Sequence, residues 1–303
     1  MPVPRARGSR ITLAVDTGNR LRPDAATSGD RLFRHTYGRG RGSDQFIPGR
    51  PYSFVAALEP GPRSWTALLN AIRPTPSEDA AEVTAARLRA VVAKLIDAGH
   101  RMGGAPPVTV VADAGYDVAR LAHLQGDLPV LMVARVRADR VYRHEARAHR
   151  PGMNERPARH DARVKPPDPA TWPEPDSATS PSTARHGAAD TRARHRPHPT
   201  LTHRSGRPEH EGEGEGEHEG EPPILPGTLI RLQVEHLPGS PDPDPVRPWC
   251  SAPEADLDLV AACRTMFLRR FDLEHTFRFL IQTLGWTRPK LRGPAAADRR
   301  PGS

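Results

Sequence analysis

Apolar residues change their spacing several times over the first 140 residues. Short runs rich in β-branched residues and followed by turn formers predict strands, whereas a 3.6-residue period predicts helices. The clearest helix follows Thr75, where Glu78 completes a capping box around a proline at the first helical position and Gly99 ends the pattern. We predict strands at 11–16, 52–58, 108–113 and 129–135, and helices at about 62–72, 76–98 and 117–125. This alternation predicts a layered α/β core.

The pattern breaks near residue 142. From there to residue 226, Pro, His, Arg, Asp and Ser dominate, and the segment ends in a Glu/His/Gly repeat, a composition typical of disorder. Two further strands are expected at 228–234 and near 246–250. The chain therefore divides into a disordered N-terminus (1–10), the first part of the core (11–141), a low-complexity, largely disordered insertion (142–226), a strand remnant of that insertion (227–252), a helical region that completes the core (253–290) and a disordered tail (291–303).

Two aspartates stand at the ends of predicted strands. Asp16 follows the run Ile11 to Val15, and Asp113 follows Val108 to Ala112. In open α/β sheets, active sites gather at such strand ends. Asp113 is also followed by Asp117, which we expect to cap the next helix.

A third acidic residue, Glu274, lies on a basic, half-apolar helix. It shares a stripe with Arg270, Phe277 and Ile281, and Arg278 borders that stripe. Taken alone, the helix favours a surface glutamate that pairs with an arginine four residues away. If the three carboxylates converge, only cations relieve their repulsion, and oxygen-only ligands favour magnesium or manganese over zinc.

The spacing Phe267-x2-Arg270-x3-Glu274-x6-Ile281 resembles the signature Tyr-x2-Arg-x3-Glu-x6-Lys of the DDE-type transposases of bacterial insertion sequences, whose catalytic domain has an RNase H-like fold. Blocks of sequence similar to one subfamily of these transposases lie at 21–43, 51–61, 113–121, 202–206 and 227–237. The resemblance implies an RNase H-like layered core, with the insertion placed before the last catalytic helix.

The resemblance also implies roles for individual residues. Asp16, Asp113 and Glu274 would form the catalytic triad and hold two Mg²⁺ or Mn²⁺ ions for DNA strand cleavage and transfer. Arg270 would clamp a DNA phosphate or orient Glu274. Ile281 departs from the family pattern, because it stands where the signature lysine would contact DNA. Further DNA contacts are expected from Arg278 on the helix and from Arg34, Arg39 and Arg41 in a Gly/Arg-rich loop.

Family members carry a helical DNA-binding region before the first aspartate and further helices after the glutamate, so the sequence predicts a transposase shortened at both ends. Two functions stay open: an active, metal-dependent transposase that acts on DNA ends, and an inactive remnant that only binds DNA through its arginines. A nuclease of the same fold outside the transposases is a third candidate. An Asp-Thr-Gly at Asp16 resembles the aspartic proteases, but a second β lobe, which that mechanism needs, is not predicted.

Composition says less about function than the motifs do. The net charge of +8 suits a phosphate-rich partner, although the abundance of arginine over lysine is also what GC-rich codons produce. Cys250 and Cys263 are too few for a disulfide framework or a thiolate zinc site. The histidines of the insertion lie in tracts typical of solvated linkers. The N-terminus shows no signal peptide or membrane span, so a cytoplasmic location without membrane contact is expected, and homodimerisation stays open.

Overall fold

The computed structural model describes residues 3–5, 10–24, 29–36, 45–60, 64–146, 160–183, 187–199, 223–236, 243–289, 293 and 295. The chain forms two compact units. The first unit comprises Met1–Val108 and Arg269–Ser303, and the second comprises Thr109–Leu268.

The first unit is built on an antiparallel sheet whose central strand is long. This strand, β3 (Gln45–Leu58), pairs with β1 (Thr12–Leu21), β2 (Leu32–Thr36) and β4 (Thr66–Ile72). Most residues of β1 and β3 are buried, because each strand combines a continuous apolar run with small residues. The sheet therefore offers a rigid, largely dry surface for the helices of this unit.

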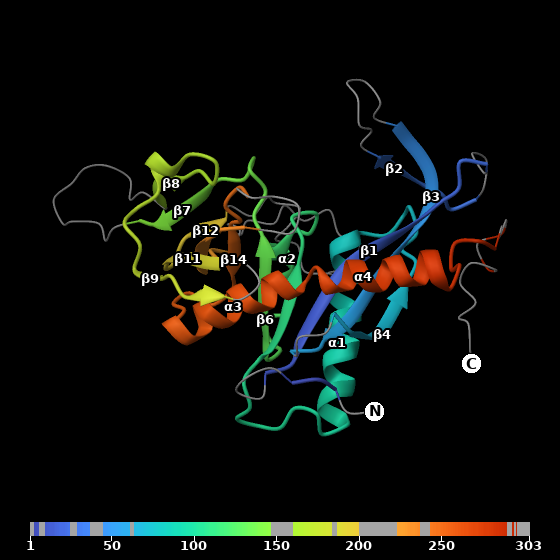
Figure 1. Ribbon diagram of the computed structural model, residues 1–303, viewed down its shortest axis with the longest axis horizontal. Helices are drawn as coiled ribbons and strands as arrows, with labels where there is room; N and C mark the ends of the chain where they lie inside the picture. The colour runs from blue at the N-terminus through green and yellow to red at the C-terminus, as the bar shows by residue number, and fades with distance from the viewer. Residues whose placement is uncertain are drawn as a thin grey trace, which may run out of the picture. The chain divides into compact units, whose positions relative to one another are not determined.

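Two helices belong to this sheet. Helix α1 (Ala80–Asp97) packs on β3 and β4, and α4 (Asp272–Arg278) crosses β1, β3 and β4 (Figure 1). The helix expected from residue 76 begins later, because the Asp79 carboxylate caps it by accepting the amide hydrogens of Ala81 and Glu82. One half of the expected capping box does form, since Glu78 accepts a 2.6 Å hydrogen bond from the Thr75 amide.

The helix expected at about 62–72 is wrong, because residues 66–72 form strand β4. Thr66 lies opposite Leu58, and Ile72 lies opposite Ser53. A short apolar run does not distinguish helix from strand by its period. Pairing with β3, whose backbone groups need partners, decides for the strand.

The second unit contains most of the remaining strands. Its main sheet has the order β5-β6-β14-β13-β11-β10, with β9 also paired to β11, and a small sheet has the order β12-β7-β8. The main sheet consists of β5 (Val108–Ala112), β6 (Val130–Arg135), β14 (Pro248–Cys250), β13 (Thr228–Val234), β11 (Gly187–Arg194), β10 (Ser182–Thr183) and β9 (Ser177–Thr179). The small sheet consists of β12 (His198–Pro199), β7 (Tyr142–Glu145) and β8 (His160–Val164), and the helical elements are α2 (Val118–Leu124), η2 (Pro169–Thr171) and α3 (Leu257–Arg269).

The strands within 142–226 differ from the predicted disorder of that segment. Strands β7 to β12 and the short helix η2 all fall inside it, whereas 147–159, 184–186 and 200–222, which include the Glu/His/Gly repeat, lie outside the described residues. Hydropathy missed these strands because β11 buries Ala189, Thr191 and Ala193 rather than large apolar side chains. The strands expected at 228–234 and near 246–250 are confirmed as β13 and β14.

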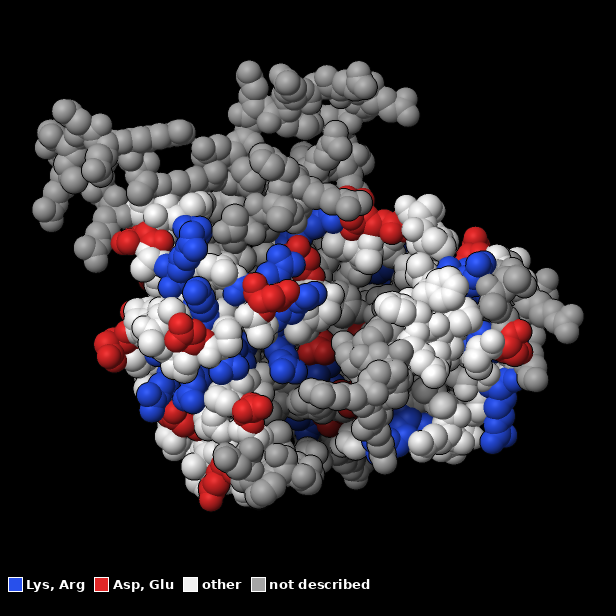
Figure 2. Space-filling view, turned by 90° about the horizontal axis from the view of Figure 1, so that it is seen from above, with Lys and Arg blue, Asp and Glu red and all other residues white. Residues whose placement is uncertain are grey.

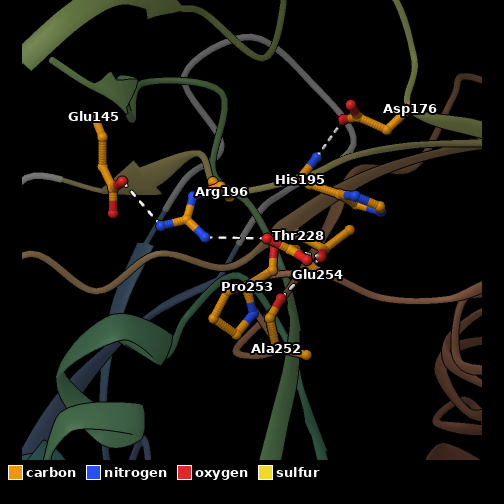
Figure 3. A network of polar contacts seen from close by, with 8 residues as sticks. All are labelled: Glu145, Asp176, His195, Arg196, Thr228, Ala252, Pro253 and Glu254. Atoms are coloured by element: carbon orange, nitrogen blue, oxygen red, sulfur yellow. Dashed lines mark hydrogen bonds and ion pairs between the residues drawn. The ribbon is translucent and has the colours of Figure 1, made fainter. Parts of the chain in front are cut away.

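A polar network fastens these strands to the turn after β14 (Figure 3). Arg196, in the left-handed region with φ 67°, donates to Glu145 at 2.9 Å and to Glu254 at 3.1 Å. The Thr228 hydroxyl donates to the carbonyl of Ala252 at 2.8 Å. These contacts join the segment after β11 to β7, and tie both this segment and the start of β13 to the turn after β14.

Candidate acidic site

Asp16 lies in the middle of β1, opposite Phe54 of β3, and the prediction that it ends a strand is wrong, because pairing with β3 continues β1 to Leu21. Its Oδ1 accepts the amide hydrogen of Thr17 at 2.7 Å, and its side chain is 21% exposed. Side chains alternate across a strand, so Gly18 lies on the same face as Asp16. The carboxylate is therefore held by its own backbone on a mostly covered face of the sheet.

Arg270 joins Asp16 to Glu274. Its Nη1 lies 3.5 Å from Asp16 Oδ2, and its Nη2 lies 3.9 Å from Glu274 Oε1. The Arg270 side chain is 5% exposed, and its guanidinium stacks over the ring of Phe271 at 4.8 Å. A single guanidinium thus faces two of the three predicted catalytic carboxylates, both of which belong to the first unit.

Aromatic packing holds the glutamate helix on the sheet. Phe277 of α4 packs against Phe54 with ring centroids 5.0 Å apart, and Trp286 meets Tyr52 edge-on at the same distance. Gly18 makes room for this packing, because a Cβ there would lie 2.8 Å from the Phe54 ring. This apolar packing therefore turns the stripe that carries Glu274 towards β1.

Polar contacts at the start of α4 were not expected from the sequence. Asp272, 2% exposed, forms a 2.5 Å ion pair with Arg269, and Arg269 also donates to the carbonyl of Glu59. The hydroxyls of Thr66 and Thr276 lie 2.6 Å apart. An acidic residue two positions before Glu274 was visible in the sequence, but nothing there distinguished a buried acid from a solvent-facing one.

Asp113 lies in the second unit, directly after β5 and at the half-buried end of that strand. The predicted cap at Asp117 is confirmed, since its side chain accepts the Arg120 amide hydrogen at 3.2 Å. A small pocket lies beside this strand end. The charged and tyrosine side chains that line it are Tyr116, Asp117, Arg135, Arg137, Arg140 and Tyr142. The sequence alone did not point to the three arginines among them.

The residues predicted to contact DNA, and Ile281 at the position of the signature lysine, differ in where they lie and in whether the structure describes them. Arg278 is exposed in the last turn of α4, and Ile281 is 38% exposed in the π-helical turn η3 (Phe279–Thr283) that follows. Arg34 lies on β2, but its side chain is outside the described part of the chain. Arg39 and Arg41 lie wholly outside the described residues.

The residues of the acidic site fit the expected Mg²⁺ or Mn²⁺ only in part. Within the described residues, no group of three or more His, Cys, Asp or Glu side chains lies in a metal-binding arrangement. Asp16 and Glu274 nevertheless offer the hard oxygen donors that Mg²⁺ and Mn²⁺ prefer, and they already converge on a cation, the guanidinium of Arg270. The donor chemistry therefore fits a divalent ion, which would have to share this place with Arg270.

The fold and the acidic site define a mixed α/β protein with carboxylates at strand positions and on a crossing helix. Residues 1–200 match the model of the DDE superfamily endonuclease family, which is more than half of the chain, and the protein belongs to that family. The match includes Asp16 and Asp113 but ends before Glu274. A comparison with the curated proteins gave no match. In the part of the chain that the structure describes, no helix is long and apolar enough to span a membrane.

Proposed function

We propose that this protein is a DDE-type transposase that cleaves and transfers DNA strands by metal-dependent phosphoryl transfer, with an RNase H-like core as in the insertion-sequence transposases. The observation that carries the proposal is Arg270, which holds Asp16 and Glu274 together within a chain of the DDE endonuclease family. Charge supports a DNA partner. Lys and Arg exceed Asp and Glu by eight, and Figure 2 shows groups of basic side chains with acidic ones set among them.

Asp16, Asp113 and Glu274 are the residues that would hold Mg²⁺ or Mn²⁺. When bound, such ions supply activation of the attacking oxygen and stabilisation of the leaving oxygen in an in-line displacement. The chain itself fixes the geometry of its carboxylates. The Thr17 amide holds one oxygen of Asp16, Arg270 faces the other, and the 53% exposure of the Glu274 side chain leaves it accessible to substrate.

The alternative is a remnant that binds DNA without cleaving it. Ile281 favours this alternative, because it stands at the position of the signature lysine, carries no charge and is partly exposed. The two functions differ in one measurable property, namely metal-dependent nicking.

The test combines calorimetric titration with Mn²⁺ and nicking of a supercoiled plasmid. Wild-type protein should bind Mn²⁺ saturably and nick DNA, and Asp16→Asn and Glu274→Gln should lose both properties. Asp139→Asn is the control, because it removes an exposed carboxylate that pairs with Arg137 in the second unit. Nicking that persists in both acidic-site variants would refute the proposal, whereas DNA binding without any nicking would support the remnant.

A further inference from the structure

Three arginines stand side by side on the main sheet of the second unit. Arg192 of β11 lies directly opposite Arg231 of β13. Arg247, just before β14, lies opposite Arg231 on the side away from Arg192. This follows from the flanking pairs, which are Leu229 with Trp249 and Leu232 with Val246. Residues directly opposite each other project from the same face, and neighbouring strands lie about 4.8 Å apart. We call Arg192, Arg231 and Arg247 the arginine row.

The arginine row projects away from the apolar core of this sheet. Ala189, Leu232 and Val234 form a buried cluster against Leu268 of α3. Ala189 pairs with Val234, three positions along the strands from the pair of Arg192 with Arg231. Because side chains alternate along a strand, an odd separation places the buried cluster on the opposite face from the arginines. The side chains of Arg192 and Arg231 are 49% and 28% exposed. The arginine row is therefore accessible to a ligand.

Arg194 extends the row towards the covered part of the same face. Its guanidinium stacks over Trp172 at 4.8 Å, and its Nε donates to the carbonyl of Pro173. Its Nη1 is buried and has no hydrogen-bond partner within the described part of the chain. Burial lowers the pKa of Arg194, and the charges of Arg192 and Arg231 lower it further. Arg194 is therefore a largely buried cation with two like charges beside it.

Acidic neighbours contact the arginine row and offset part of its charge. Asp190 lies 3.0 Å from Arg192 and 3.9 Å from Arg231, at the exposed end of the row. Burial lowers the pKa of Arg247, the charge of Arg231 lowers it further, and Asp244 opposes both effects. Glu174 and Asp176 likewise raise the pKa of Arg194 without reversing its net lowering. Like charges directly opposite each other destabilise a sheet. A ligand with several negative charges in a line would reverse that cost.

We propose that the arginine row binds the phosphate backbone of a nucleic acid, which is duplex DNA if the proposed function holds. Three guanidinium groups spread over about 10 Å exceed the reach of a single phosphate and suit successive phosphates of one strand. Contacts of this kind position a duplex without reading its sequence. The strands around residues 177–250 would then be a DNA-holding surface, separate in role from the acidic site.

The experiment measures binding of a labelled duplex by fluorescence anisotropy while KCl rises from about 50 to about 200 mM. Arg231→Gln with Arg247→Gln removes two charges of the row. Arg143→Gln with Arg163→Gln is the matched control, because these two arginines also lie opposite each other, in the small sheet of the same unit. Each lost phosphate contact lowers the slope of log affinity against log salt by about 0.9. The salt-induced loss of affinity should therefore be about 12-fold smaller in the row variant than in wild type, and unchanged in the control.

Two other outcomes would overturn the arginine row, and a third would count against the proposed function alone. A row variant with the wild-type slope, or a control that loses as much slope, overturns the arginine row as a DNA site. Thermal stabilisation by inorganic phosphate that equals stabilisation by duplex at the same phosphate concentration, and that disappears in the row variant, would identify a small-anion site and also overturn it. Failure of the proposed function looks different: the wild-type protein would bind duplex with a row-dependent slope and never nick a plasmid in the presence of Mn²⁺.

Discussion

Arg270 provides the sharpest test of the acidic site, because one side chain joins its two described carboxylates. We consider Arg270→Met, which keeps most of the buried stem and removes the guanidinium. The substitution deletes the ion pair at 3.5 Å to Asp16, the longer one to Glu274 and the stacking on Phe271. Arg278→Met is the control, since Arg278 is exposed in the last turn of the same region.

The expected loss of stability follows from exposure. Removing one partner of a fully buried ion pair costs about 3–5 kcal/mol, and a cation–π contact contributes about 1 kcal/mol. Asp16 is 21% exposed and Glu274 is 53% exposed, so solvent screens much of the first term. We therefore expect a loss of about 2–3 kcal/mol, which lowers the melting temperature by roughly 5–10 °C. The control should change by no more than about 0.5 kcal/mol.

Differential scanning calorimetry with and without Mn²⁺ provides the assay. In Arg270→Met, the repulsion between Asp16 and Glu274 is no longer relieved by the guanidinium, so Mn²⁺ should raise the melting temperature more than in wild type. Equal stability of Arg270→Met and Arg278→Met would show that the Arg270 contacts contribute nothing. If Arg270→Met is destabilised as expected but Mn²⁺ raises its melting temperature no more than that of wild type, the idea that the two carboxylates converge on a cation site is refuted.

Two further predictions concern the second unit. Burial lowers the pKa of His198 to about 4, with a smaller contribution from His160, so the unfolded chain binds more protons than the folded one between about pH 6.5 and 4. Stability should therefore fall by about 2 kcal/mol from pH 7 to pH 5 relative to His198→Gln in urea titrations, and parallel pH profiles of the two proteins would contradict this. Gly227→Ala should cost about 3 kcal/mol, because its Cβ would lie 2.4 Å from the fully buried Trp249 ring. Gly103→Ala meets no atom within 4 Å, and equal urea midpoints of the two alanine variants would contradict the clash.

Local patterns predicted the elements whose signals are strong within a few residues. The strands β5 and β6 and the helix α2 lie within one or two residues of their predicted bounds, since each has a compact apolar run and a clear turn or cap. The elements that were missed depend on distant partners. β4 is a strand because β3 lies beside it, and β11 is a strand although its buried residues are small.

The candidate site was predicted in its residue types but not in its connections. An expected strand end pointed to Asp16, although the residue lies within β1, and helix spacing pointed to Glu274. Arg270 was expected either to orient the glutamate or to contact DNA. No local pattern could show that Arg270 is buried and reaches Asp16, because that contact depends on how α4 crosses β1. The arginine row was equally hidden, since Arg192 and Arg231 lie on two different strands, Arg247 lies just before a third, and only strand pairing brings them together.

The contacts of Arg270 also change the weight of the simplest interpretation of Glu274. A surface glutamate paired with an arginine four residues earlier is common and says little about function. That pair is present here, but at 3.9 Å it is the weaker of the two contacts that Arg270 makes. The closer contact is to Asp16, and the aromatic packing of Phe277 on Phe54 keeps α4 where both contacts are made. An exposed i,i+4 pair would need neither a buried arginine nor an aspartate on the strand beneath it, so the arrangement favours a site over a solvent-facing pair.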